Sequence, residues 1–599
     1  MAEEPEDCLL ELGPSPISFE PVSKFTNVFY DETTKEVATV RSGGATGIVV
    51  KGPNLKTALN FRVEDKGTVL SLKFSPNHQV LAIQRSSITV EFLNFSGTEP
   101  EGQEYSVTCR GKNAVILGFI WLSNTDFALV SNQGLEHHQV TPEKRVVRLM
   151  KFHSLQTNWF VYSSSISLLL ISSGQLGNCL NPFLYKNGQF LRMTKFEVEV
   201  FAPATPSQPP RLCLLERDIT CTSIYGNVVV AVLRHQGKSS SSSNQTIPNA
   251  EIVLFTLSKD TPPRKTHIIQ LNQSGRFAVS VVDNLIIVHQ QASRSSVIFD
   301  ISLAGISDGR LTYHSPVVGP TPIRQFVLAV PASAALLEAA HPAISCEMYS
   351  SGWVFFQPNV IIDAELGLLW TVELKLQHVK KYIDNIETLI EFLMQRKDSK
   401  KVILAVLKDI LSSSPVCDVA KLGKIFDRIN EAYRTVLELE MQSQMAMPAN
   451  SPLQMRPPQV LPRPVVHLDQ NEIYSQVFLQ LIADEQISDK LVVIFLSEYM
   501  RSLVQWHIPV QYFIHEMLIE ALVRQGSFYR LHQLVQYHAI SDSKPLVSFA
   551  RDCGIVDQLP ARKFLEAALN SHDPGVFFAT YKFFEQRNLR LRGNSSFLK

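Results

Sequence analysis

Hydrophobic and polar residues alternate with a period of two through most of residues 1–370. Short runs rich in β-branched and aromatic residues, such as 36–40, 47–50 and 68–74, are separated by polar or glycine-containing turns. This alternation is typical of half-buried antiparallel strands. Within Val69–Phe92 the order is strand, turn, strand, turn, strand, as in one blade of a WD-type β-propeller.

The same pattern recurs at 116–138 and at 276–300. The Trp-Asp dipeptides and Gly-His pairs of standard WD repeats are absent, so the blades are divergent and the pattern does not give their number. A stretch of roughly 350 residues is long enough for seven blades at the usual repeat length. We therefore predict a WD-like β-propeller over residues 1–370.

Two polar stretches interrupt this pattern. A serine-rich loop lies near 238–246 and contains the unbroken run Ser239–Ser243, and Ala202–Arg211 contains four prolines. We interpret both as insertions at blade tips, where surface loops tolerate added length. Phosphorylation sites are the alternative interpretation of either loop.

After Trp370 the hydrophobic period changes to 3.6, which predicts helices. The segments that follow it are Lys380–Lys397, Lys400–Leu411, Val419–Met441, Glu472–Asp484, Lys490–Val504, Val510–Arg524, Tyr529–His538, Ala561–Leu569 and Gly575–Gln586. Short connections between them favour antiparallel pairs, as in an α-solenoid. Six prolines within 447–465 exclude a helix there. The prediction is a first helical segment at 371–446, a proline-rich linker at 447–465 and an α-solenoid at 466–599.

Composition agrees with a folded protein that has several domains, because 599 residues exceed the size of one hydrophobic core. Lys+Arg and Asp+Glu both number 56, so no net field attracts nucleic acid. The acidic start lacks a signal peptide, and the longest apolar runs, such as Leu491–Leu496, are too short to cross a bilayer. Eight cysteines without a CxxC pair are typical of a reduced compartment. We expect a soluble cytoplasmic protein.

The candidate chemistry is weak. Arg41–Gly47 is rich in glycine but precedes a predicted strand and lacks the Gly-Lys-Ser/Thr ending of a phosphate-binding loop, so we predict a tight turn. On a strand, His137 and His138 point to opposite faces and do not share a metal easily. Asp283 with His289, and Asp300 with His314, lack a supporting nucleophile motif, and we expect them to be structural. We predict no catalytic, cofactor-binding or metal-binding residues, no cofactor and no enzymatic activity.

The apolar faces of the C-terminal helices are first of all solenoid core, and secondly surfaces for partner helices. Near the end of the chain lie four basic residues, Lys582, Arg587, Arg590 and Arg592. They could bind an acidic lipid or an acidic partner. A helix terminus exposed to solvent explains them equally well.

Several segments resemble one metazoan family, the regulator subunit of the Mon–Ccz exchange complex, also called the Bulli or Mic-one-like family. In the first half the matching segments are Arg41–Gly47, Val49–Pro53, Ile83–Arg85, Pro142–Arg145, Val281–Leu285 and Ser296–Asp300. In the second half they are Ser541–Leu546, Ala561–Leu565 and Phe583–Gly593. The matches follow one another in order over almost the whole chain.

The resemblance implies a β-propeller followed by an α-solenoid, in a third, non-catalytic subunit of a guanine-nucleotide exchange factor. The implied partners are the Mon and Ccz subunits and, indirectly, the late-endosomal Rab GTPase (Rab seven). The implied processes are endosome maturation, lysosomal fusion and autophagy. The implied location is cytoplasmic, peripheral on late-endosomal, lysosomal and autophagosomal membranes. No site residues follow from the resemblance.

The sequence departs from the family pattern at one place. Only Val547–Pro560 separates the segments at 541–546 and 561–565, where family members carry a long helical stretch. The solenoid is therefore expected to be shortened between 547 and 560, as in a shortened splice form. Our leading hypothesis is a scaffold that contacts the Mon–Ccz dimer through its helical half, including Glu472–His538. The alternative is a coat- or tether-like subunit that contacts membrane or cargo directly through its propeller.

Overall fold

The computed structural model describes residues 8–97, 99–200, 212–235, 250–303, 305–328, 344–412, 418–445, 466–483, 487–527, 529–530 and 533–534. The chain forms two compact units, Met1–Tyr382 and Ile383–Lys599, which we treat separately. Some predictions fall outside the described residues. These are the serine-rich and proline-containing loops of the first unit, the proline-rich linker, the shortened segment, the last two predicted helices and the basic residues near the end.

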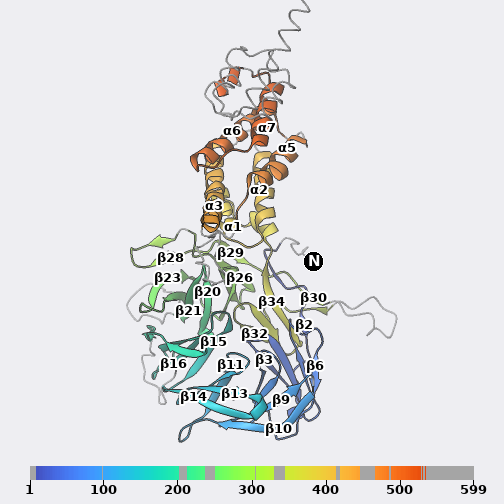
Figure 1. Ribbon diagram of the computed structural model, residues 1–599, viewed down its shortest axis with the longest axis vertical. Coiled ribbons are helices and arrows are strands. Elements are labelled where there is room, and N and C mark those ends of the chain that lie inside the picture. Colours follow the sequence, from blue (N-terminus) through green and yellow to red (C-terminus); the bar gives the residue numbers. More distant parts are fainter. Residues whose placement is uncertain are drawn as a thin grey trace, which may run out of the picture. The chain divides into compact units, whose positions relative to one another are not determined.

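The described part of the first unit contains seven sheets of four to six strands, arranged as the blades of a β-propeller (Figure 1). Blade 1 consists of β3 (Thr26–Asp31), β4 (Glu36–Arg41), β5 (Gly47–Lys51) and β6 (Leu59–Phe61). Blade 2 consists of β7 (Ser71–Phe74), β8 (Val80–Gln84), β9 (Thr89–Ser96) and β10 (Glu99–Thr108). Blade 3 consists of β11 (Ile116–Trp121), β12 (Asp126–Ser131), β13 (Gly134–Thr141) and β14 (Val146–Ser154). Blade 4 consists of β15 (Trp159–Ser163), β16 (Leu168–Ser173), β17 (Cys179–Lys186), β18 (Gln189–Arg192) and β19 (Phe196–Glu197).

The remaining blades have less regular edges. Blade 5 contains β20 (Ile219–Ile224), β21 (Asn227–His235), β22 (Ala250–Leu257), β23 (Arg264–Gln270), β27 (Ile306–Ser307) and β28 (Thr312–His314). Blade 6 contains β24 (Phe277–Val282), β25 (Leu285–Gln290), β26 (Ser295–Phe299) and β29 (Val318–Thr321). Blade 7 contains β32 (Trp353–Phe356), β33 (Val360–Asp363), β34 (Leu368–Leu374), β1 (Leu10–Leu12) and β2 (Ile17–Ser18). A separate two-stranded sheet joins β30 (Val327–Leu328) to β31 (Ile344–Ser345).

Blade 7 closes the ring with a strand from the beginning of the chain. In this blade β1 pairs antiparallel with β34, and Leu10 lies opposite Leu374. The strand pairings within the blades are antiparallel, except that β23 and β28 run parallel. The predicted propeller is therefore confirmed, with seven blades. Trp370 lies inside β34, so the last strand continues four residues beyond the predicted end of this region.

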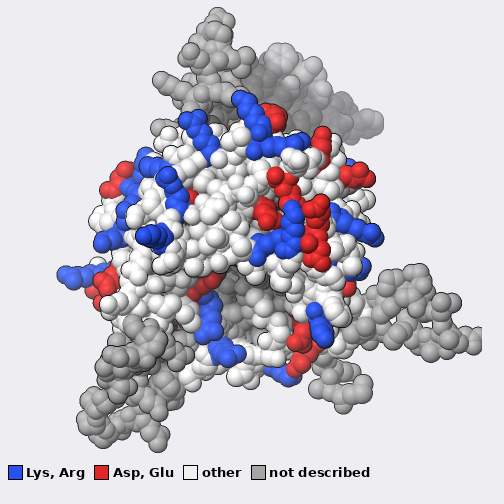
Figure 2. All heavy atoms as spheres, turned by 90° about the horizontal axis from the view of Figure 1, so that it is seen from below, with Lys and Arg blue, Asp and Glu red and all other residues white. Residues whose placement is uncertain are grey.

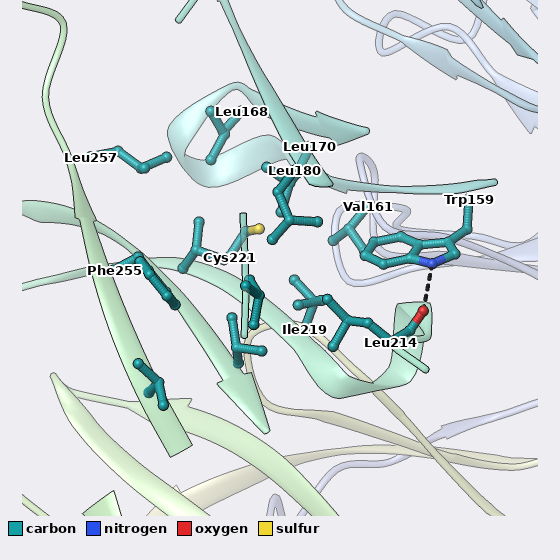
Figure 3. Packing of buried hydrophobic residues seen from close by; sticks show 14 residues of the cluster. Trp159, Val161, Leu168, Leu170, Leu180, Leu214, Ile219, Cys221, Phe255 and Leu257 are labelled. Atoms are coloured by element: carbon teal, nitrogen blue, oxygen red, sulfur yellow. Dashed lines mark hydrogen bonds between the residues drawn. The ribbon is translucent and has the colours of Figure 1, made fainter. Parts of the chain in front are cut away.

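The core of the propeller consists of hydrophobic clusters shared by consecutive blades. The cluster between blades 4 and 5 contains side chains from β15, β16, β20 and β22 and is drawn in Figure 3. Trp159 packs there through its indole ring, and its Nε1 donates to the carbonyl oxygen of Leu214 at 2.9 Å. A buried tryptophan needs such an acceptor, because an unpaired N–H in an apolar core is costly. Successive side chains of a strand point to opposite faces of its blade, so Leu168 and Leu170 enter this cluster while Leu169 and Ile171 pack in the cluster on the other side of blade 4.

The second unit contains helices. They are α1 (Ile386–Met394), α2 (Lys400–Ser412), α3 (Val419–Met445), α4 (Gln470–Ile473), a π-helical turn (Tyr474–Phe478), α5 (Leu479–Ala483), α6 (Asp489–Gln505) and α7 (Tyr512–Arg524). The predicted helices up to Arg524 are thus present, with shifted ends; the segment predicted from Lys380 begins as a helix only at Ile386. Asn385 caps α1 by accepting from the backbone N–H groups of Glu387 and Thr388. The long helix α3 packs against both α1 and α6.

Candidate functional site

The glycine-rich segment forms the turn between β4 and β5. Gly43 and Gly44 have φ angles of 64° and 99°, which favour glycine. A Cβ atom on Gly43 would lie 2.8 Å from the carbonyl oxygen of Gly67, and one on Gly44 would collide with the side chain of Val63. The turn contains one 3-10 turn at Ser42–Gly44, leads into strand β5 and does not open an α-helix. The prediction of a tight turn is confirmed, and geometry alone accounts for these glycines.

The two adjacent histidines of β13 point to opposite faces of blade 3, as predicted. The ring of His137 packs against Tyr185 and Phe190, and its Nε2 lies 2.9 Å from Asp126 Oδ1. The ring of His138 faces Phe127, and its Nε2 lies 3.0 Å from Glu136 Oε2. Each ring therefore has its own carboxylate partner. Among the described residues, no group of three or more His, Cys, Asp or Glu side chains could hold a metal ion.

The other two histidines singled out in the sequence have structural partners. His289 is buried between Ser296 Oγ at 2.8 Å and Ser280 Oγ at 3.1 Å, and burial lowers its pKa to about 3. It is therefore neutral at physiological pH and fixed by two hydroxyl groups. His314 Nε2 lies 3.0 Å from His267 Nδ1, so these two imidazoles share one hydrogen bond. Asp300 accepts a hydrogen bond from the hydroxyl of Tyr225 at 2.7 Å.

A cluster of carboxyl groups, which the sequence pattern does not indicate, lies where several blades approach one another. The pKa of Glu32 is raised to about 7, mainly by burial; the Lys73 ammonium lowers it, and the charges of Glu216 and Asp31 raise it. Burial also raises the pKa values of Asp31 and Glu216, and the Lys73 ammonium lowers both. Blade 4 contributes Ser164, whose Oγ donates to the carbonyl oxygen of Glu32 at 3.3 Å. The positive charge of Lys73 thus favours the ionised form of three carboxyl groups, which come from blades 1 and 5.

Charge on the surface is mixed. Figure 2 shows lysine and arginine side chains interspersed with aspartate and glutamate, with broad uncharged areas between them. The equal numbers of basic and acidic residues produce no large field of one sign on this face. No helix among the described residues is long and apolar enough to span a membrane.

The second unit contains a pocket of about 300 Å³ between α1, α3 and the end of α6. Its apolar lining comes from Ile390, Ile425 and Trp506. Charged side chains from α1 and α3 also line it: Glu387, Glu391, Lys424, Asp427, Arg428 and Glu431. Several of these already form ion pairs, for example Arg428 with Glu431 at 2.7 Å. A pocket with apolar side chains and partly ion-paired charged side chains in its lining suits a side chain of a partner protein.

Comparison with known proteins identifies the family. The family model described as "Regulator of MON1-CCZ1 complex, N-terminal" matches residues 28–147, and the corresponding C-terminal model matches 396–549 and 547–599. A human protein named regulator of MON1-CCZ1 complex is 38% identical over 640 aligned positions, which cover 99% of this chain and 95% of the human protein. The chain belongs to this family. The mouse protein of the same name matches with the same identity and coverage.

A more distant member of the regulator family occurs in Dictyostelium discoideum. That protein, named a homolog of the regulator of MON1-CCZ1 complex, is 22% identical over 517 positions, covering 74% of this chain and 49% of its own length. Solved structures similar to the chain include the WD40 domain of Toxoplasma gondii coronin, with a TM-score of 0.33 and 13% identity over 62% of this chain and 87% of that one. Another is the Cps50 (Swd1) β-propeller domain of Myceliophteria thermophila, with a TM-score of 0.29 and 12% identity over 49% and 88%.

Proposed function

We propose that this chain is a non-catalytic regulatory subunit that assembles with the MON1-CCZ1 complex. The observation that carries the proposal is the 38% identity to the human regulator over nearly the full length of both proteins. Both ends of the chain match models of the regulator family, so the similarity includes the propeller and the helical unit. The seven-bladed propeller and the partly exposed helices offer surfaces for assembly, in agreement with a scaffold.

The finer function follows from the family resemblance. As part of this complex, the chain supports nucleotide exchange on the late-endosomal Rab GTPase (Rab seven), and thereby endosome maturation, lysosomal fusion and autophagy. It associates peripherally with late-endosomal, lysosomal and autophagosomal membranes through the complex. The α-solenoid that the sequence predicts at 466–599 belongs to this proposal, since solenoid repeats stack on their neighbours.

The helical half carries the main contact in this proposal. Three large apolar side chains of the helical unit are exposed near α5, α6 and α7: Leu479, Val504 and Tyr512. Val504 lies two residues before Trp506, which lines the pocket of this unit. Exposed apolar side chains beside a pocket with both apolar and charged lining are typical of protein interfaces.

Co-expression with the MON1 and CCZ1 subunits tests the proposal. We expect a stable three-way complex in size-exclusion chromatography with mass determination, and a dimer that elutes without this chain would contradict it. Val504→Asp should weaken co-purification, whereas Ile306→Asp, which changes an exposed side chain of blade 5, should not. If deletion of 465–599 leaves assembly intact, the contact lies outside the solenoid while the regulatory role stands.

A second candidate is a coat- or tether-like subunit that contacts membrane or cargo directly through its propeller. The exposed Phe25 and Leu70 side chains of the propeller favour such a contact. Flotation of the purified chain with liposomes, in the absence of partners, would support this candidate. Loss of flotation when the exposed side chains of the propeller are replaced would assign the membrane contact to the propeller.

We also propose that the chain lacks a solenoid segment near 547–560. The C-terminal family model matches in two stretches that meet at 547–549. The alignment with the human regulator spans 640 positions, more than the 599 residues of this chain, so it contains gaps in this chain. Insertion of the corresponding human segment after residue 549 should strengthen binding to the MON1-CCZ1 dimer, because solenoid repeats stabilise their neighbours. Unchanged binding would show that this segment is not needed for the contact.

A further inference from the structure

One edge of the propeller brings together the ends of strands from four consecutive blades. Antiparallel pairing places the start of β3, the end of β4 and the start of β5 at the same end of blade 1. The corresponding ends of blades 7, 2 and 3 carry the 364–367 turn, the 85–88 turn and the start of β11. We refer to this border of blades 7, 1, 2 and 3 as the glycine-turn edge, because it contains Ser42–Gly47.

Hydrogen bonds show that these ends are neighbours. The N–H of Val22 donates to the carbonyl oxygen of Ala364 at 2.8 Å, which joins blade 7 to the segment before β3. Arg85 Nη1 donates to the carbonyl oxygen of Gly43 at 3.1 Å, which joins blade 2 to blade 1. The N–H of Ile116 donates to the carbonyl oxygen of Ser87 at 2.8 Å, which joins blade 3 to blade 2. The glycine-turn edge is therefore one continuous surface.

Large apolar side chains are exposed along this edge. Phe25 is 67% exposed and Leu70 is 51% exposed. Other exposed members, each in or beside a connecting turn, are Val22, Ile88, Val115 and Leu366. Single exposed apolar residues are normal, but six along one edge of a propeller indicate a contact surface.

Basic residues accompany the apolar ones. Lys24 Nζ lies 5.8 Å from the centre of the Phe25 ring. Arg110 and Lys112 are exposed shortly before Val115, and in the described part of the chain neither they nor Lys24 form an ion pair. Acidic residues also lie nearby: Glu64 lies 3.6 Å from Lys66 Nζ, Asp65 accepts from the N–H of Gly67 at 3.1 Å, and Glu365 is exposed in the 364–367 turn. Unpaired positive charge thus lies beside exposed apolar groups.

We propose that the glycine-turn edge docks on an anionic membrane surface. The apolar side chains lie on separate turns of four blades. This arrangement suits an extended surface such as a membrane, into which each side chain can insert separately. Phe25 and the aliphatic residues enter the boundary between headgroups and acyl chains, and the lysine and arginine side chains bind phosphate and carboxylate groups of anionic lipids. Charge complementarity favours this ligand over a neutral surface. The inference rests on the second candidate function, direct contact of the propeller with a membrane, and does not depend on the regulatory role, since it concerns the chain without its partners.

Co-sedimentation of the full chain with vesicles tests the proposal. We expect binding to phosphatidylcholine vesicles that contain phosphatidylserine, weakened by salt, and much less binding to pure phosphatidylcholine. The double variant Phe25→Asp/Leu70→Asp should bind at least about tenfold more weakly, because it loses two apolar insertions. Lys24→Glu/Lys112→Glu should reduce binding to the anionic vesicles by about tenfold or more, and should not change binding to neutral ones.

Ile306→Asp is the matched control. Ile306 is 77% exposed on β27, away from the glycine-turn edge, and its change should leave vesicle binding intact. Circular dichroism establishes that each variant is folded. The proposal is overturned if the wild-type chain stays in the supernatant, or if the edge variants and the control bind alike. Loss of MON1-CCZ1 binding in Phe25→Asp/Leu70→Asp, with no vesicle binding by the wild type, would overturn it in favour of a protein interface.

Discussion

Arg85 Nη1 donates a hydrogen bond to the carbonyl oxygen of Gly43 at 3.1 Å, and so ties blade 2 to the glycine-rich turn of blade 1. The same guanidinium donates to the carbonyl oxygens of Gly67 at 2.9 Å and Glu64 at 3.2 Å. Its Nε lies 3.3 Å from Glu91 Oε2. One side chain thereby satisfies backbone acceptors of two separate loops, which have no regular strand partners. Planar guanidinium geometry allows this, whereas a single ammonium group does not.

Arg85→Ala should lower the free energy of unfolding by about 2–4 kcal/mol, because three carbonyl oxygens lose a charged donor and Glu91 loses its counter-charge. Arg85→Lys should recover only a small part of the loss. Urea unfolding measured by fluorescence checks both values. Arg294→Ala is the control: its ion pair with Glu347 is exposed, and its removal should change stability by less than about 0.5 kcal/mol. Equal effects of the two alanine variants would contradict the role of Arg85 as a link between blades.

Gly44→Ala tests the packing of the same turn. The Cβ atom of an alanine at position 44 collides with the side chain of Val63. The alanine must also adopt a φ angle of 99°. Gly188 provides the comparison, because it has a φ of 72° and no atom near the position of a Cβ. Gly188→Ala should cost roughly 1–2 kcal/mol for the left-handed backbone alone. Gly44→Ala should cost at least about 1 kcal/mol more, from the collision. Thermal unfolding of both variants measures the difference, and similar values would mean that Val63 moves aside freely.

Sequence pattern was sufficient for the propeller because short apolar and β-branched runs separated by turn residues recur along it, and strands buried on both faces, such as Leu168–Ser173, are apolar over most of their length. The number of blades could not be predicted. Blade 7 is completed by β1 from the beginning of the chain, and blade 5 gains β28 in a parallel pairing, so neither has a regular spacing in sequence. The structural role of His289 was expected, but its serine partners follow only from the packing of β24, β25 and β26.

The carboxyl cluster shows a second limit of sequence analysis. Glu32, Lys73 and Glu216 belong to blades 1, 2 and 5, and nothing in their spacing relates them. Only the closed ring brings them together. The helices were predicted from their hydrophobic period, which does not fix their ends: Asn385 caps α1, so this helix begins at Ile386 and not at Lys380. The pocket around Trp506 depends on how α1, α3 and α6 pack, which no local pattern specifies.

Glu32→Gln should stabilise the protein at alkaline pH. The pKa of Glu32 is about 7 when folded, against an ordinary value of 4.5, so the folded state holds more protons between these values. The contribution of Glu32 to the free energy of unfolding is therefore complete below pH 4.5 and is lost as the pH rises through 7. The amide cannot ionise, so the variant should gain up to about 3 kcal/mol at pH 8 relative to the wild type. Ser164 bonds to the backbone carbonyl of residue 32 and is unaffected.

Urea unfolding at several pH values measures the gain of Glu32→Gln. Glu64→Gln is the control, because the Glu64 side chain is 81% exposed to solvent. The variant and the wild type should have similar stability at pH 4, where Glu32 is protonated in the folded state. A gain that does not depend on pH would show that packing of the amide, and not ionisation of the carboxyl group, is responsible.

His289 should produce the opposite dependence on pH. Its pKa is about 3 in the folded protein, because burial between Ser280 and Ser296 opposes protonation, so the unfolded state binds more protons between pH 3 and 6.5. Stability is complete above pH 6.5 and is lost as the pH falls toward 3. His289→Gln keeps a polar side chain for the two serine hydroxyls but cannot be protonated. It should be less stable than the wild type at pH 7.5, by about 1–3 kcal/mol, since the fit to both hydroxyls is poorer. Between pH 6.5 and 4 its stability should fall less steeply than that of the wild type. Parallel curves for the two proteins over that range would exclude His289 as the group whose protonation destabilises the propeller.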